Sequence, residues 1–106
     1  MNESTTIDFA SIEGPVYTGR ERGTLLRDYL KIPALEADNV HIRVSIPDAT
    51  YTISSSFFLG LFGPSVIQCG SKEAFYKKYE FVANEFLKSI IDGHVDRALQ
   101  ERNLFK

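Results

Sequence analysis

The chain has 106 residues, of which 43% are hydrophobic and 25% charged, and its formal net charge is -2. This length predicts one domain over residues 1–106, with residues 1–4 frayed. Lys and Arg are scattered along the chain and form no basic stripe, which argues against nucleic-acid binding.

Cysteine usage and hydropathy favour a reducing compartment. Cys69 is the only cysteine, so no internal disulfide can form. The first residues lack the basic and apolar regions of a signal peptide, and no apolar stretch approaches the roughly 18 residues of a membrane span. We therefore expect a cytoplasmic protein that does not act at a membrane.

Two segments alternate between apolar and polar residues, as strands do. Residues 5–10 (TTIDFA) predict an edge or near-edge strand, which a turn at Gly14-Pro15 follows. Residues 40–46 (VHIRVSI) give the clearest alternation in the chain and predict a buried strand. Pro47-Asp48 ends this strand, and residues 50–53 predict a short extended return.

A helix is predicted between these strands. Thr18 and Glu21 have the spacing of a capping box. The expected apolar stripe is Leu25, Leu26, Tyr29 and Leu30, with Arg20, Glu21, Arg27 and Asp28 on the solvated side. Gly23 lowers helix propensity, and a close contact with a neighbouring element would explain it. Pro33 is expected to end the helix, leaving residues 34–39 as a polar connector.

Three serines, Ser54–Ser56, stand where the return gives way to an apolar helix. A serine at this position is a natural N-cap. The stripe Phe57, Phe58, Leu61 and Phe62 is most simply core, but part of it could be exposed as a partner-binding surface. Gly63-Pro64 predicts a kink or a restart, and Gly70 is a good C-cap residue.

The last third predicts a helix, a strand and a helix. Ser71 caps a short helix over residues 71–78, and residues 79–83 form a strand. Asn84 caps the final helix, which runs from Glu85 to about Arg102. Its expected stripe is Phe86, Leu87, Ile90, Ile91, His94, Val95, Ala98 and Leu99. Strands separated by helices predict a small α/β sandwich, with a parallel or mixed sheet of about three to four strands and helices packed on it.

The stretch from Val40 to Gly63, with its hydrophobic strand and its serine-rich turn opening a helix, resembles the STAS domain. That family includes the anti-sigma-factor antagonists of bacteria. The whole chain resembles the bacterial STAS-like domains grouped as DUF4325, through GRERGTLLRDYL (19–30) and ISSSFFLGLFGPSV (53–66). The resemblance covers roughly residues 5–99.

The resemblance implies a regulatory interaction module that is not an enzyme. In anti-sigma-factor antagonists, a partner ATP-dependent kinase phosphorylates a serine at this turn, and the phosphate then blocks binding to that kinase. The phosphorylated serine carries over to Ser55, with Ser56 next. This chain has Ser54 where the antagonists carry an acidic residue, and Phe57 where they carry a glycine. Ser54, Phe57, Phe58 and Asp48 are the expected partner-binding residues.

Several alternatives stay open. A small molecule, nucleotide or anion could bind at the same helix N-terminus, with Arg20 as an anion contact. A serine nucleophile would need His41 or His94 as its base, and nothing in the sequence places either beside Ser55. For Arg20 and Asp48, solvated charge is the simpler interpretation. No metal or cofactor is expected, and a homodimer through the last helix is a further structural alternative.

Overall fold

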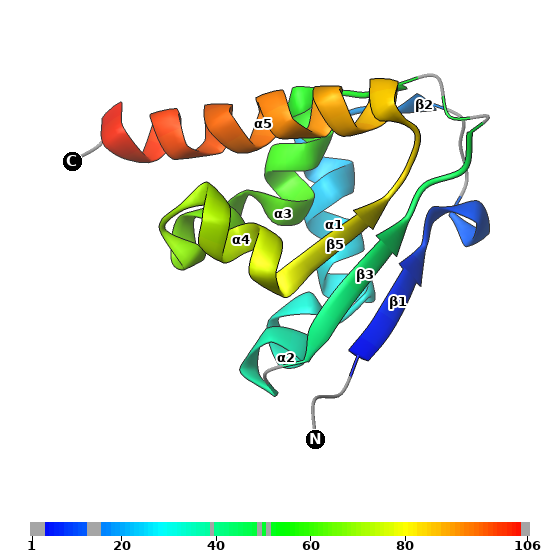
Figure 1. Cartoon of the computed structure of the whole chain (residues 1–106), viewed down its shortest axis with the longest axis horizontal. Helices are drawn as coiled ribbons and strands as arrows, with labels where there is room; N and C mark the ends of the chain where they lie inside the picture. The colour runs from blue at the N-terminus through cyan, green and yellow to red at the C-terminus, as the bar shows by residue number, and fades with distance from the viewer. Residues whose placement is uncertain (1–3, 13–15, 39, 49, 51, 105–106) are drawn as a thin grey trace.

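The computed structural model describes residues 4–12, 16–38, 40–48, 50 and 52–104, and Figure 1 shows how its elements are arranged. Within these residues the order is β1 (Ser4–Asp8), the 3-10 helix η1 (Phe9–Ser11), β2 (Val16–Tyr17), α1 (Arg20–Tyr29), α2 (Ile32–Ala37), β3 (His41–Ser45), β4 (Thr52–Ile53), α3 (Ser55–Cys69), α4 (Lys72–Lys78), β5 (Tyr79–Val82) and α5 (Glu85–Leu104). The predicted turn at Gly14-Pro15 and the predicted frayed residues 1–3 lie outside the described residues, whereas Ser4 opens β1.

The main sheet is parallel and has the strand order β1-β3-β5, so the predicted edge position of the first strand is confirmed. Ile7, Val44 and Phe81 are aligned across the three strands, and all three side chains are buried. Their neighbours Arg43 and Glu80 are exposed, because successive side chains point to opposite faces of a sheet. Helices α1 and α3 lie behind the sheet in Figure 1. The predicted α/β fold with helices packed on a parallel sheet is therefore confirmed.

A second, smaller sheet joins β2 to β4. Val16 pairs with Thr52 and Tyr17 pairs with Ile53, also in parallel. The predicted extended return covered residues 50–53, and its last two residues, Thr52 and Ile53, form strand β4. Residues 16–17, in contrast, form a strand that was not predicted from the sequence.

Helix α3 is at the centre of the core. Phe57, Phe58, Leu61 and Phe62 are each at most 2% exposed. The helix contacts α1, α4 and α5, which leaves its apolar side chains little access to solvent. It continues through Pro64 without restarting and ends at Gly70, whose left-handed φ of 83° confirms the predicted C-cap.

Helices α1 and α3 cross at two glycines. A Cβ atom on Gly23 would lie 2.2 Å from the Phe57 carbonyl oxygen, and one on Gly60 would lie 2.2 Å from the Arg20 carbonyl oxygen. Only glycine lets the two backbones approach this closely. The close contact that was predicted for Gly23 is therefore confirmed, and it fixes the start of α1 against the first turns of α3.

The predicted stripe of α1 is only half right. Leu26 and Leu30 pack against the core, but Leu25 is 62% exposed and Tyr29 is 74% exposed. The contact through Gly23 sets the rotation of α1, which leaves the two large side chains of Leu25 and Tyr29 in solvent. Apolar spacing alone could not indicate that rotation.

Two boundaries around α1 differ from the prediction. The N-cap is Gly19, with no side-chain hydrogen bond, so Thr18 does not cap the helix. The residues predicted as a connector, 34–39, mostly belong to α2 (Ile32–Ala37). Pro33 lies in the first turn of α2, where its missing N–H has no consequence, so it opens a helix here instead of ending one.

The C-terminal third follows the prediction closely. The Ser71 hydroxyl accepts a hydrogen bond from the Ala74 N–H at 3.1 Å, and the Asn84 side-chain oxygen accepts one from the Leu87 N–H at 2.9 Å. The predicted stripe of α5 is correct in part. Leu87, Ile91, Val95 and Ala98 are buried and Leu99 packs against the core, whereas Ile90 and His94 are half-buried and Phe86 is 67% exposed. None of the described helices has the length and apolar character needed to cross a membrane.

Candidate functional site

The three serines at the start of α3 have different surroundings. The Ser54 hydroxyl accepts a hydrogen bond from the Phe57 N–H at 3.1 Å, so Ser54 is the N-cap. Ser55 is half-buried and Ser56 is exposed. The capping role is thus filled by the first serine, and the hydroxyl best presented to solvent is that of Ser56.

The apolar stripe behind the serines is not a surface. Phe57 is fully buried and Phe58 is 2% exposed, so the interpretation that part of this stripe faces a partner is wrong. Both rings lie in the core because α3 is enclosed by α1 and α5 as well as by α4. Replacing Phe58 by Asp would therefore damage the core before it could report on partner binding.

Other side chains surround the junction without joining the serines. The Asp48 carboxylate is exposed and accepts a hydrogen bond from the Asn84 amide at 3.5 Å. Arg20 forms a surface ion pair with Glu101 at 3.7 Å, and its carbonyl faces Gly60, one helical turn after Ser56. An anion contact by Arg20 stays a prediction.

Both histidines have partners elsewhere. The His94 ring is hydrogen-bonded to the Ile53 carbonyl oxygen at 2.7 Å and lies against Phe58. The His41 ring lies 4.0 Å from the Glu80 carboxylate, on the exposed sheet face. In the described part of the chain, neither ring is hydrogen-bonded to a serine of the junction.

A buried polar network that the sequence did not indicate joins four elements. The Arg27 guanidinium donates to the Leu61 carbonyl oxygen at 2.9 Å and to the Ser65 hydroxyl at 2.8 Å, and it pairs with the Glu36 carboxylate at 3.3 Å. The Tyr79 hydroxyl donates to the other Glu36 oxygen at 2.6 Å. Arg27 was predicted on the solvated side of its helix, but its side chain is only 11% exposed.

This network holds the structure together. Burial, followed by the hydrogen bond to Glu36, raises the pKa of Tyr79, so its hydroxyl stays a donor. Among the described residues, no buried side-chain polar atom lacks a hydrogen-bond partner. A network whose buried atoms are all hydrogen-bonded rigidifies the contact between α1, α2, α3 and β5.

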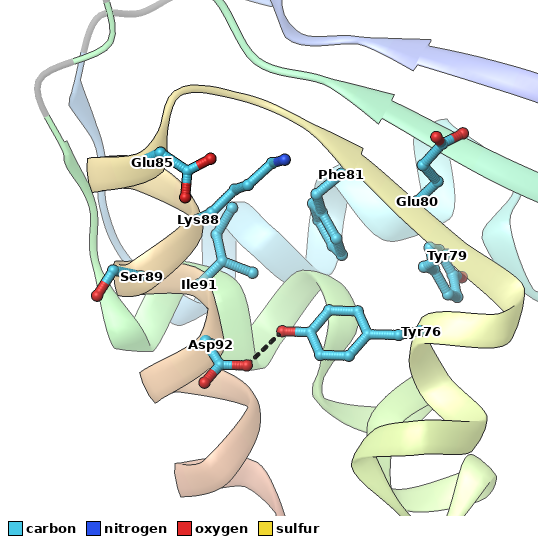
Figure 2. Close-up of a pocket in the computed structure, with 9 residues that line it drawn as sticks. All are labelled: Tyr76, Tyr79, Glu80, Phe81, Glu85, Lys88, Ser89, Ile91 and Asp92. Atoms are coloured by element: carbon cyan, nitrogen blue, oxygen red, sulfur yellow. Dashed lines mark hydrogen bonds between the residues drawn. The ribbon is translucent and has the colours of Figure 1, made fainter.

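The clearest concave feature is elsewhere, beside β5 (Figure 2). A groove of about 550 Å³ lies between this strand, α4 and α5. Tyr76, Phe81 and Ile91 give it apolar walls, and Glu85 and Lys88 reach toward it from the first turns of α5. No residue of the serine junction lines it, so the sequence-predicted site and the groove are separate.

A hydrogen-bonded cluster closes one end of the groove. The Tyr76 hydroxyl donates to Asp92 at 2.9 Å, and the Lys72 ammonium bonds Asp92 at 2.8 Å and Asp96 at 3.0 Å. The bond from Lys72 is the main reason that the pKa of Asp92 is lowered, and the two aspartates raise the pKa of Lys72. Burial, then the bond to Asp92, raises the pKa of Tyr76.

Two further observations bear on chemistry. Within the described residues, no group of three or more His, Cys, Asp or Glu side chains is placed to hold a metal ion. Cys69 is a half-buried free thiol whose pKa is raised by burial and by the nearby Glu36 carboxylate, so the thiolate is disfavoured. Comparisons with protein-family models, with curated proteins and with solved structures find no match to the chain.

Proposed function

We propose that this protein is a STAS-like regulatory module that binds another protein and is not an enzyme. Phosphorylation of Ser56, or of its neighbour Ser55, switches that binding off. The partner implied by the STAS resemblance is an ATP-binding kinase-like protein or ATPase in a bacterial cytoplasm. The observation that carries the proposal is the exposure of Ser56 in the first turn of α3, next to a serine already used as the cap.

The start of α3 is chemically suited to a phosphate. The N-terminus of a helix has N–H groups without intrahelical partners and carries roughly half a positive charge, which favours an anion. The Ser54 hydroxyl already accepts from the Phe57 N–H, so the cap persists whether or not the next serines are modified. A phosphate on Ser56 therefore changes the surface and leaves the helix intact.

The two residues that follow the serines are buried, so phosphorylation changes only the surface of the first turn of α3. Phe57 and Phe58 anchor the first turn in the core, so a modified Ser56 cannot be accommodated by moving that turn. A phosphoserine adds about -1.5 to -2 charges. On a contact surface that includes Ser55 and Ser56, that charge repels an acidic or apolar partner face.

The test is recovery of the tagged protein from its native cells, followed by identification of co-purifying proteins. We expect the native chain and Ser56→Ala to recover the same ATP-binding partner, and Ser56→Asp to lose it. Gln68→Glu is the matched control, because it adds one negative charge to the exposed far end of the same helix. If Ser56→Asp and Gln68→Glu retain the partner equally, the binding surface is not at this junction.

The small-molecule alternative has its own discriminating measurement. Thermal unfolding with nucleotides and inorganic anions at millimolar concentration reports any ligand by mass action. The interaction module predicts a flat response across the panel. Stabilisation that Ser56→Asp removes would instead assign the helix N-terminus to a ligand and contradict the proposed function.

A further inference from the structure

The free edge of β5 faces the groove. β5 is the last strand in the order β1-β3-β5, and the groove lies between it and the two helices α4 and α5. The Ile46 N–H donates to the Val82 carbonyl oxygen at 2.9 Å, which shows that the peptide groups of Val82 face β3. Peptide groups of successive strand residues point to opposite edges, so those of Phe81 and Tyr79 point away from β3.

Part of that edge is unpaired. The Tyr79 N–H donates back to the Phe75 carbonyl oxygen at the end of α4. Among the described residues, the Phe81 N–H and carbonyl form no hydrogen bond with a loop, turn or helix cap, and they do not face β3. Tyr79 is fully buried, so its carbonyl is not accessible from the groove. One donor and one acceptor, both of Phe81, thus face the groove, and this pair can bond the main chain of an extended segment.

The groove also offers side-chain contacts beside this edge. Its volume of about 550 Å³ is in the range of sites that bind ligands. The Tyr76 ring lies edge-on to the Phe81 ring, and Ile91 lines the same groove, so the groove has an apolar wall. Glu85 and Lys88 reach toward the same opening, and neither takes part in an ion pair with any described residue. One free charge of each sign therefore borders the unpaired edge.

We propose that this groove binds a short extended peptide segment of a partner protein, which adds to β5 as a fourth strand. The Phe81 N–H and carbonyl pair with its main chain. An apolar side chain of the segment lies on the wall of Tyr76 and Ile91. A basic and an acidic residue flank it, opposite Glu85 and Lys88. The surface goes beyond the serine switch, because no serine of the junction lines it.

The test begins with selection of random peptides of about twelve residues against the full chain, and titration of the enriched synthetic peptide. The blocking variant is Ser89→Trp, which fills the groove from an exposed position on α5. Gln100→Trp is its control, an exposed site on the same helix that does not line the groove. We expect Ser89→Trp to weaken peptide binding at least about tenfold and Gln100→Trp to leave it unchanged.

Amide hydrogen exchange identifies the binding mode. Bound peptide should slow exchange of the Phe81 N–H at least about tenfold, while the Val82 N–H, already directed to β3, stays unchanged. The proposal is overturned if a peptide binds without slowing exchange of the Phe81 N–H. It is also overturned if the selection enriches no peptide that binds the native chain better than the Ser89→Trp variant. If exchange of the Phe81 N–H slows as the protein concentration rises in the absence of peptide, a second copy of the chain occupies the groove. That result also overturns the proposal. Circular dichroism of both tryptophan variants verifies that they fold.

Discussion

Replacing Gly60 by alanine is the sharpest test of how the helices pack. The added Cβ would lie 2.2 Å from the Arg20 carbonyl oxygen and 3.0 Å from the Thr24 nitrogen, whereas ordinary contacts begin at 3.4 Å. The obstacle is backbone, which cannot rotate away as a side chain can. The two helices must therefore separate by about 1 Å, and a gap of that size forfeits a quarter to a half of each contact it opens.

The expected cost follows from two opposing effects. Overpacking of a core costs about 1–3 kcal/mol, and the rigid obstacle favours the upper end of that range. Alanine recovers about 1 kcal/mol of helix propensity relative to glycine. We therefore expect Gly60→Ala to lower the free energy of unfolding by about 2 kcal/mol. Gly93→Ala is the control, since nothing lies within 4 Å of its Cβ position, and it should raise stability by about 0.5–1 kcal/mol.

Urea unfolding followed by circular dichroism measures both effects. The Gly23→Ala, Gly60→Ala double variant adds a further check, because the first Cβ already separates the helices. The second should then cost less than it does alone. If Gly60→Ala is as stable as the native chain while Gly93→Ala shows its gain, the close crossing of α1 and α3 is wrong.

Four further substitutions concern caps and charges. Ser54→Ala should lower the free energy of unfolding by about 1 kcal/mol, seen as a lower urea midpoint at unchanged slope; no change would mean that Ser54 is not the cap. Glu36→Gln should cost about 3 kcal/mol in the same assay, because it leaves the Arg27 charge buried without its partner. Glu80→Gln should cost less than about 1 kcal/mol, because the Glu80 carboxylate of that ion pair is 49% exposed. Equal costs for Glu36→Gln and Glu80→Gln would contradict the assignment of one ion pair as buried and the other as exposed. Asp92 has a pKa below its usual 3.8, so its ionised form stabilises the fold above that pH and loses this contribution as pH falls through the lowered value. Asp92→Asn should accordingly lower the melting temperature slightly at neutral pH and lose this effect as the pH falls through the lowered pKa of Asp92, and a deficit that grows in acid would contradict the sign.

Local signals in the sequence were sufficient for much of the fold. Strict alternation over residues 40–46 identified the central strand, and each cap predicted at Ser71, Asn84 and Gly70 occurs. These features depend on neighbours within a few residues, so the chain itself contains the information. Pro33 shows where such local signals fail, because a proline is equally compatible with the end of one helix and with the first turn of the next.

What the sequence did not indicate depends on contacts between distant segments. Arg27 was assigned to solvent from its helical position, but it reaches across to Glu36 on a helix that was not predicted. The exposure of Ser56 and the burial of Phe58 likewise depend on which helices enclose α3. The groove beside β5 is formed by three elements, and no spacing along the chain marks it.

The most direct test of the serine switch is phosphate mapping on the endogenous protein, in its free and partner-bound fractions. The proposed function predicts phosphate on Ser56 or Ser55 in the free fraction, none on either serine in the bound fraction, and an unmodified Ser54 in both, since its hydroxyl is the cap. An unmodified Ser55 and Ser56 in both fractions, or equal phosphate in both, would contradict it.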